Sequence, residues 1–406
     1  MKFDQVKKVV LYSVGIGIIF VSGYYLGGSG FKLETGSFPK VSISREIPID
    51  RRDVNFGLFW RIWDIIDESY YDKTKISPQK MVYGAISGMV GALGDPYTAF
   101  LPPEENKVVE EDLSGSFEGI GIQIGFKNKD LAVIAPLPNS PAEKAGLKAG
   151  DLIVGIIDLE KKIDTVTTGI NLNDAVKMIR GKKGTKVTLV IVRDDATDPM
   201  KVEVVRENID VPSVTVNFIE NEKIAHIKLM KFGADTDSEW NKAVSQIVQK
   251  KDVSKVILDL RNNPGGYLQS AVDIAGEFVK KDSVIVIESK GKVENEFKTD
   301  RFGKLENYKV VILVNAGSAS ASEILAGALR EIKNYKLIGE KTFGKGTIQE
   351  PLQLDKGSSL HITTAKWLTP NKNWVNEKGL EPDITVVDSL DTEVDEQLQE
   401  AIKEIS

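Results

Sequence analysis

The sequence has no cysteine and only two histidines, His226 and His361. The lack of cysteine excludes disulfide bonds, thiolate metal sites and cysteine nucleophiles. With so few histidines, neither a histidine-based metal site nor a Ser-His-Asp triad is expected. A serine nucleophile in this chain would therefore need another base, which favours a lysine.

An excess of positive charge is also missing. The chain carries 53 Lys and Arg against 59 Asp and Glu, a formal net charge of −6, and no basic stripe is visible. This argues against a nucleic acid as a partner. A hydrophobic content of 41% in 406 residues is ordinary for a globular protein of two or three domains.

Charges are absent from one long segment near the N-terminus, residues 9–30, whose length is about that needed to span a bilayer. Three lysines among the first eight residues would keep the N-terminus in the cytoplasm. No clear A-x-A cleavage site follows. Residues 1–30 are therefore predicted to be a cytoplasmic stub and an uncleaved transmembrane signal anchor, with cleavage near Gly28–Gly30 as the alternative. The rest would lie outside the cytoplasm, joined by a linker over residues 31–52.

An aromatic stripe marks the next region, residues 53–110. A second helix of this region begins at Ser77-Pro78, where serine caps the helix and proline occupies its first turn. We expect the stripe to pack in a core, and contact between two copies in a homodimer is the alternative. The stripe repeats with helical spacing and consists of Phe56, Phe59, Trp60, Trp63 and Ile66.

Residues 111–207 resemble a PDZ domain. A glycine turn opens a strand at Gly119-Ile120-Gly121-Ile122, so its backbone N–H groups can form a nest for a terminal carboxylate. A later helix would form the second wall of a groove that binds a peptide by strand addition. The expected partners are proteins with accessible C-terminal tails. The apolar face of that helix consists of Leu172, Ala175, Val176 and Ile179.

The junction after the apolar run Val310–Val314 is the main candidate for chemistry. The run predicts a buried strand, and the spacing of apolar residues after it predicts a helix that begins near Ser320. A hydroxyl at such a helix N-terminus lies where unpaired N–H groups favour developing negative charge. Ser318, Ser320 and Ser322 alternate here, and the pattern alone does not choose among them. Ser320-x-x-Glu323 is also a capping box, which needs no catalytic role.

A second glycine-rich stretch, residues 339–347, holds Lys345 between two glycines. In an otherwise apolar setting, a lysine can lose solvation and have its pKa lowered enough to act as a base. The stretch nearly matches a phosphate-binding loop. However, Gly346 stands where that loop needs a serine or threonine, and a strand pattern rather than a helix follows.

A third glycine turn, Arg261–Gly266, follows the apolar strand Val256–Leu260 and precedes a helix. Strand, glycine turn and helix in this order form an anion-binding geometry. The same arrangement occurs in crotonase-like acyl-CoA hydratases, which polarise a carbonyl with two backbone N–H groups. A tight turn that needs glycine for positive φ is the structural alternative.

Two of these stretches resemble the carboxyl-terminal processing, or tail-specific, serine peptidases. Gly-Ser-Ala-Ser-Ala-Ser-Glu at 317–323 and Gly-Lys-Gly-Thr-Ile-Gln at 344–349 stand in that family's order and spacing. The resemblance covers roughly residues 55–388. The resemblance implies that Ser320 is the nucleophile, that Lys345 is the general base and that Gln349 orients the lysine.

The same resemblance implies further roles. The oxyanion hole would consist of the backbone N–H of Ala321 and that of one glycine of the pair Gly265/Gly266. Arg193 would couple the PDZ-like domain to the catalytic site, and a solvated strand end is an equal alternative for this arginine. No metal and no organic cofactor is implied.

The predicted fold class is a multidomain α+β protein. It comprises the transmembrane anchor, the helical region, the β-rich PDZ-like domain and a crotonase/ClpP-like α/β catalytic core over residues 208–388. Residues 389–406 predict an acidic amphipathic C-terminal helix, which is expected to be a docking element. The expected function is that of a membrane-anchored serine endopeptidase that cuts proteins near their C-termini. A catalytically inactive membrane PDZ scaffold and a crotonase-like acyl enzyme are the alternatives.

Overall fold

The computed structural model divides the chain into two units, residues 1–84 and 85–406. The described residues are 14–15, 18, 20–22, 24, 31–35, 41–45, 55–127, 129–193, 198–219, 223–387 and 394–406. The predicted anchor, residues 9–30, lies largely outside them. Within the described part of the chain, no helix combines the length and the apolar character needed to cross a membrane.

In the first unit, two short strands occupy part of the segment where a linker was predicted. β1 (Phe31–Thr35) and β2 (Val41–Arg45) form an antiparallel pair. The sequence alternates apolar and polar residues in both, which is the period of a strand. The structure therefore differs from the linker prediction for these residues. The 3-10 turn η2 (Lys73–Lys75) and helix α3 (Pro78–Gly91) follow later, with Pro78 in the first turn as predicted.

The aromatic stripe lies on α2 (Gly57–Ser69), and it does not pack in a core. None of the described residues of α2 is buried, and Trp60 is 57% exposed. The rings of Phe59, Trp60 and Trp63 contact one another along the helix instead. The prediction of core packing is therefore wrong, because every described residue of α2 stays at least partly exposed.

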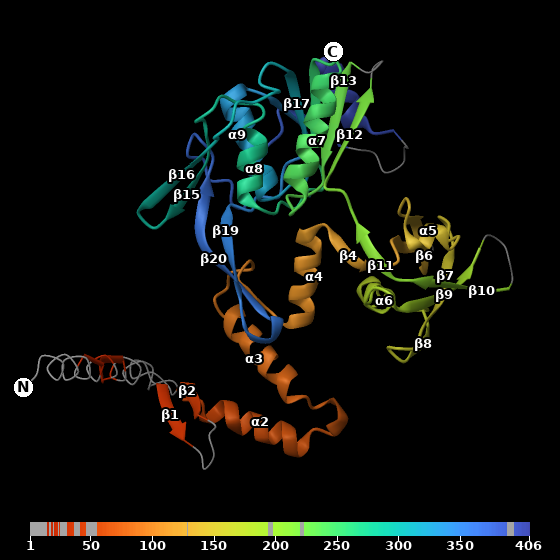
Figure 1. Cartoon of the computed structure of the whole chain (residues 1–406), viewed down its shortest axis with the longest axis vertical. Helices are drawn as coiled ribbons and strands as arrows, with labels where there is room; N and C mark the ends of the chain where they lie inside the picture. Colours follow the sequence, from red (N-terminus) through yellow and green to blue (C-terminus); the bar gives the residue numbers. More distant parts are fainter. Residues whose placement is uncertain are drawn as a thin grey trace, which may run out of the picture. The chain divides into compact units, whose positions relative to one another are not determined.

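The PDZ-like region is a sheet in the order β10-β9-β7-β6-β5, with β8 paired to β7 (Figure 1). Helices α5 (Pro141–Lys144) and α6 (Leu172–Ile179) accompany it. One apolar cluster fills the domain, and Ala175 and Ile179 contribute from the predicted face of α6. The strands are β5 (Ile122–Lys127), β6 (Asp130–Pro136), β7 (Leu152–Asp158), β8 (Ile163–Val166), β9 (Lys186–Val192) and β10 (Met200–Val205).

Short segments flank this domain on both sides. Helix α4 (Pro103–Ser114) leads into β4 (Ser116–Gly119), and β4 pairs with β11 (Glu207–Asp210) as the chain leaves the domain. The entering and leaving strands are thus held together by a two-stranded antiparallel sheet.

The core is built on a six-stranded sheet in the order β12-β13-β14-β17-β18-β21. The β12–β13 pair is antiparallel and the other pairs are parallel. Parallel neighbours need crossover connections, which are supplied here by α7 (Thr236–Gln249), α8 (Leu268–Ala275) and α9 (Ala321–Lys333). The strands are β12 (Val214–Ile219), β13 (Ile224–Leu229), β14 (Lys255–Asp259), β17 (Lys309–Val314), β18 (Lys336–Gly339) and β21 (Ile384–Thr385).

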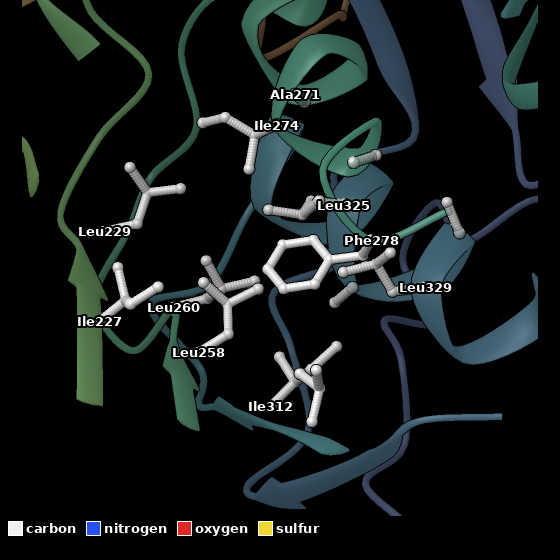
Figure 2. Packing of buried hydrophobic residues seen from close by; sticks show 14 of the residues in the cluster. Ile227, Leu229, Leu258, Leu260, Ala271, Ile274, Phe278, Ile312, Leu325 and Leu329 are labelled. Atoms are coloured by element: carbon white, nitrogen blue, oxygen red, sulfur yellow. The ribbon is translucent and has the colours of Figure 1, made fainter. Parts of the chain in front are cut away.

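Both faces of this sheet are covered, which explains its continuous apolar runs. Along β17, Val310, Ile312 and Val314 join the cluster under α7, α8 and α9, whereas Val311 and Leu313 join the opposite cluster. Figure 2 shows Phe278 among side chains of the first cluster, with Leu325 and Leu329 from α9 close to its ring.

Helix α10 (Glu396–Ile405) covers the second face, so the predicted docking of the C-terminal helix is confirmed. Its buried Ala401 and Ile405 pack with Ile257, Val311 and Leu313 of the sheet. The apolar residues recur at helical spacing along the helix, which places them on one face.

A second sheet completes the core, in the order β16-β15-β20-β19, with β3 (Ala99–Leu101) paired to β20. Thus β3, which precedes the PDZ-like domain, is part of the core. The strands are β15 (Val284–Lys290), β16 (Val293–Lys298), β19 (Thr347–Gln353) and β20 (Ser359–Leu368), with η3 (Asp355–Gly357) between the last two.

Candidate active site

Loops after three adjacent parallel strands carry most of the predicted site residues. Residues 260–267 follow β14, residues 315–320 follow β17, and residues 340–346 follow β18. The carboxyl ends of parallel strands meet at one edge of a sheet, where α/β proteins commonly bind ligands. The fold therefore brings together segments that lie far apart in the sequence.

The structure distinguishes among the three serines at the start of α9. Ser318 and Ser322 are 0% exposed, and their hydroxyls donate to Leu260 O and Asn263 O at 2.8 Å each. These two buried hydrogen bonds join the segment at the start of α9 to the loop after β14. Ser320 is only partly buried and holds the N-cap position with φ 55° and ψ −115°. Strained backbone of this kind is typical of a nucleophile on a strand-to-helix turn.

Glu323 connects the Ser320 turn to the Lys345 loop. Its side chain is completely buried and accepts a hydrogen bond from Ser320 N at 2.9 Å, which closes the predicted capping box. The same carboxylate accepts from Lys345 N at 2.9 Å, from Gly344 N at 2.7 Å and from Thr342 Oγ1 at 2.6 Å. The capping box is therefore present, but its carboxylate also fixes the loop that carries the lysine.

Lys345 lies partly buried in that loop, with its amine 5.1 Å from the centre of the Tyr97 ring. Burial desolvates the amine and lowers its pKa below the ordinary value of lysine, although the carboxylates of Asp95 and Glu323 oppose this shift. No hydrogen bond joins Lys345 Nζ to Ser320 Oγ within the described residues. Without substrate, catalytic hydrogen bonds are often long or poorly aligned and tighten only in the bound complex, so the lack of this bond is compatible with a Ser320–Lys345 dyad.

The glycines around Lys345 are needed for close packing rather than for phosphate binding. Gly344 has φ 91°, and a Cβ there would lie 2.8 Å from Gly379 N. A Cβ on Gly346 would lie 2.7 Å from both Asn376 N and Trp374 Nε1. Strand β19 rather than a helix follows, which agrees with the sequence argument against a phosphate-binding loop.

The predicted oxyanion turn lies directly beside the Ser320 turn. A Cβ on Gly265 would lie 2.8 Å from Ser320 Cβ and 3.0 Å from Ala321 N. Gly265 N donates to Asn263 Oδ1 at 2.9 Å, so this N–H is already used. Among the described residues, neither Gly266 N nor Ala321 N donates a hydrogen bond. Gly266 is therefore the glycine of the pair whose N–H is available, together with the N–H of Ala321, to bind an oxyanion.

Gln349 makes no hydrogen bond to Lys345 within the part of the chain that the structure describes. Its amide donates to Thr347 Oγ1 at 2.8 Å and to Thr363 Oγ1 at 3.3 Å. The register of β19 against β20 shifts between Ile348 and Gln349, which changes the direction of the side chains there. The role of Gln349 in orienting Lys345 stays a prediction.

Sequence reasoning missed two groups that interact with the lysine amine. Asp95 and Tyr97 belong to the turn before β3, about 250 residues away in the chain. The run Asp95-Pro96-Tyr97 resembles the helical region that precedes the PDZ domain in this family, but that resemblance gave no reason to place it beside Lys345. Glu323 was noticed only as a helix cap, since a capping box is complete without a distant partner.

An ion network ties the oxyanion turn to the C-terminal helix. Arg261, which begins the turn, donates to Asp259 at 2.8 Å and to Asp395 at 2.7 Å. His226 Nε2 lies 3.1 Å from Asp259 Oδ2, the same carboxylate oxygen that accepts the 2.8 Å hydrogen bond from Arg261. Burial opposes ionisation of Asp259, yet the hydrogen bonds from His226 and Arg261 hold its pKa far below the ordinary value. His226 is thus a structural residue, as expected from its strand.

The predicted peptide groove has an available strand edge. β5 is the last strand of its sheet and pairs only with β6 among the described strands. The glycine turn precedes it, with Gly121 at φ 74° and Ile120 buried in the domain core. Ile122 packs against the same apolar cluster as Ala175 of α6. This is the arrangement that strand addition requires.

Arg193 is held within the PDZ-like domain. Its guanidinium forms a two-point pair with the buried Asp151, at 2.7 and 2.8 Å, and donates to Gly146 O at 2.7 Å. These contacts exclude a merely solvated strand end. Coupling to the catalytic site stays a prediction.

Comparisons with known proteins agree with this organisation. Residues 223–386 match peptidase family S41, residues 133–193 match the PDZ domain, and residues 42–105 match the N-terminal domain of the activating protease CtpB. Over 384 residues the chain is 33% identical to the carboxy-terminal processing protease CtpB of Bacillus subtilis, covering 94% of this chain and 78% of that relative. The chain belongs to the carboxy-terminal processing proteases of family S41.

Two further similarities accord with this membership. The carboxy-terminal processing protease CtpA of Bacillus subtilis is 38% identical over 333 residues, which cover 82% of this chain and 69% of that relative. A solved structure assigned to the S41 proteases, from Bacteroides fragilis, superposes with a TM-score of 0.53 at 14% identity and covers 81% of this chain and 90% of that one. At that identity the superposition shows the fold alone.

Membership in family S41 decides between the functions that the sequence left open. The chain is a serine-type endopeptidase of the carboxy-terminal processing kind, with a PDZ domain. The resemblance drawn from the motifs at 317–323 and 344–349 is thereby confirmed. The inactive scaffold and the crotonase-like acyl enzyme are set aside.

Proposed function

We propose that this S41 protease cuts proteins near their C-termini with a Ser320–Lys345 dyad, while held at the membrane by its N-terminal segment. The observation that carries the dyad is the buried Glu323 carboxylate, which binds Ser320 N and Lys345 N at 2.9 Å each. One side chain thus sets the distance between the backbones of nucleophile and base. Ser318 and Ser322 are committed to buried hydrogen bonds, which leaves Ser320 as the nucleophile.

In the proposed reaction, the neutral Lys345 amine takes the proton of Ser320 as Oγ attacks the scissile carbonyl. The oxyanion accepts hydrogen bonds from Ala321 N and Gly266 N. Lys345 then gives its proton to the leaving amine, so that an acyl-enzyme forms and the C-terminal fragment departs. Water, deprotonated by the same lysine, hydrolyses the ester and restores Ser320. Gln349 would orient the amine once substrate is bound.

The dyad predicts a specific pattern of variants. Ser320→Ala and Lys345→Ala should each lower kcat/KM by about 10⁴-fold or more, and the double variant should lose little more because the pair acts as a unit. Lys345→Arg should fail too, because arginine stays protonated. Cleavage of a protein with an apolar C-terminus, followed by mass spectrometry, measures the loss.

Matched controls for this experiment are Ser318→Ala and Ser322→Ala. Ser322→Ala removes one hydrogen bond and Ser318→Ala removes two, because Ser318 Oγ also accepts from Asn315 N. At about 1 kcal/mol for each bond, stability should fall modestly while cleavage continues. Retained cleavage by Lys345→Ala, or loss of cleavage in folded Ser318→Ala alone, would contradict the dyad.

We propose that the PDZ domain binds the substrate tail along β5, with the terminal carboxylate at the turn Gly119–Ile122. A carboxylate there can accept charge-assisted backbone hydrogen bonds of roughly 1.5–3 kcal/mol each. Amidation of the substrate C-terminus should therefore lower kcat/KM on the order of tenfold or more. The measurement compares one protein substrate with a free and an amidated end. Equal cleavage of the two would mean that the domain recognises something other than the chain end.

The membrane anchor remains a proposal that rests on the uncharged residues 9–30 and the lysines before them. The full chain should sediment with membranes and resist an alkaline wash, with the catalytic part accessible from outside the cytoplasm. A chain that begins at residue 31 should stay in the supernatant with unchanged kcat/KM on a soluble substrate. Sedimentation of the shortened chain, or a soluble full chain, would argue against a single-span anchor.

The homodimer is likewise proposed from the exposed aromatic face of α2. Trp60 is 57% exposed on a helix that buries none of its described residues, and such a stripe is typical of an association surface. Trp60→Glu should convert a dimer into a monomer in sedimentation velocity. Phe302→Glu serves as control, because Phe302 is 81% exposed elsewhere in the chain. A wild-type monomer, or dissociation by both variants, would count against this face.

A further inference from the structure

The turn Asp95–Thr98 lies against the amine of Lys345, although it comes from the region before the PDZ domain. The Tyr97 ring centre is 5.1 Å from Lys345 Nζ, within the range of a cation–π contact. Within the described residues, Nζ makes no hydrogen bond and no ion pair. Among the described residues, the amine of Lys345 therefore interacts with the face of the Tyr97 ring.

Hydrogen bonds fix the ring in place. Asp95 accepts from Tyr97 N at 3.0 Å and from Thr98 Oγ1 at 2.6 Å, which forms a closed Asx turn. Thr98 Oγ1 in turn accepts from Thr363 N of β20 at 3.0 Å. The residues just after the turn continue into β3, which pairs with β20 through Ala99 and His361. The turn is thus attached to the strand beside the site.

Several titratable groups surround the amine. Asp95 and Glu323 favour its charged form, whereas burial disfavours that form. His361 of β20 has its pKa lowered by burial and by the charge of Lys345. Burial raises the pKa of Tyr97, with further contributions from Glu323, Asp95 and Glu377, so its hydroxyl stays neutral. The ring therefore faces the amine without a charge of its own.

We propose that Tyr97 is a positioning residue for the base of this protease: its ring face holds the Lys345 side chain in the site, and the Asp95 turn holds the ring. The inference rests on the proposed dyad. A protonated lysine is attracted to the ring face, whereas a neutral amine is not, so loss of the proton frees the amine to approach Ser320. A segment outside the catalytic core sequence would thereby complete the catalytic geometry.

The test is the pH dependence of kcat/KM in Tyr97→Leu, with Tyr97→Phe as the matched control. Tyr97→Leu removes the ring that favours the charged amine, so the pKa of Lys345 falls. The acidic limb should move to lower pH by about 0.4–1.5 units. Tyr97→Phe keeps the ring face and should retain the wild-type profile. Asp95→Asn should also move the limb to lower pH, since it removes a negative charge.

A purely structural role would lower kcat at every pH and leave the limb in place, and that result would overturn the proposal. Equal damage in Tyr97→Phe and Tyr97→Leu would also overturn it, because the hydroxyl rather than the ring would then matter.

A second measurement does not depend on proteolysis. Labelling with trace acetic anhydride across a pH series, read by mass spectrometry of the Lys345 peptide, gives the pKa of that amine in the folded wild type and in Tyr97→Leu. An unchanged value overturns the role of Tyr97 even if the dyad is correct. If the pKa of Lys345 is lowered in Tyr97→Leu while Lys345→Ala still cleaves, the ring acts on the amine but the dyad is refuted.

Discussion

The buried carboxylate of Glu323 is the interaction on which the site depends. A carboxylate removed from water is very costly unless hydrogen bonds replace its hydration, and here four donors do so. Its position in the first turn of α9 adds the favourable field of the helix N-terminus. Three of its donors belong to the loop after β18 and one to the turn after β17, so satisfying this one charge holds two loops in a single geometry.

Glycine makes that geometry possible because the loops touch through their backbones. Gly265, Gly344 and Gly346 each lie where a Cβ would meet another chain segment within 3.0 Å. Such contacts tolerate no side chain, and a shift of about 1 Å in a catalytic group is costly. The Arg261–Asp395 pair then ties the oxyanion turn to α10, which packs on the far face of the same sheet. The C-terminal helix thus supports the site through a charge pair as well as through apolar burial.

The Asp95–Thr98 turn adds a different kind of support. It precedes the PDZ domain, whereas the strand that it joins, β20, lies after the serine and the lysine. Because this segment leads through α4 and β4 into the PDZ domain, the residues that contact the base and the domain that would bind the tail are close neighbours in the chain. A short stretch of chain therefore connects the domain that would bind the substrate tail to the residues that contact the base.

The sequence by itself determined the local features: the strand-to-helix turn at Ser320, the glycine turns, the amphipathic α10, the PDZ domain and the family. The local elements follow from periodicity, capping and spacing, which act over a few residues, whereas the PDZ domain and the family came from the resemblance of short motifs to known proteins. The local pattern could not choose among Ser318, Ser320 and Ser322, and the choice of Ser320 came from the family resemblance; in the structure, burial and distant acceptors distinguish the three. It also placed the stripe of α2 in a core, since periodicity shows that a face is apolar and not what covers it. The contacts of Glu323 and Tyr97 with the Lys345 loop were decided by tertiary structure alone, because their partners lie about 20 and 250 residues away and no local rule connects such positions.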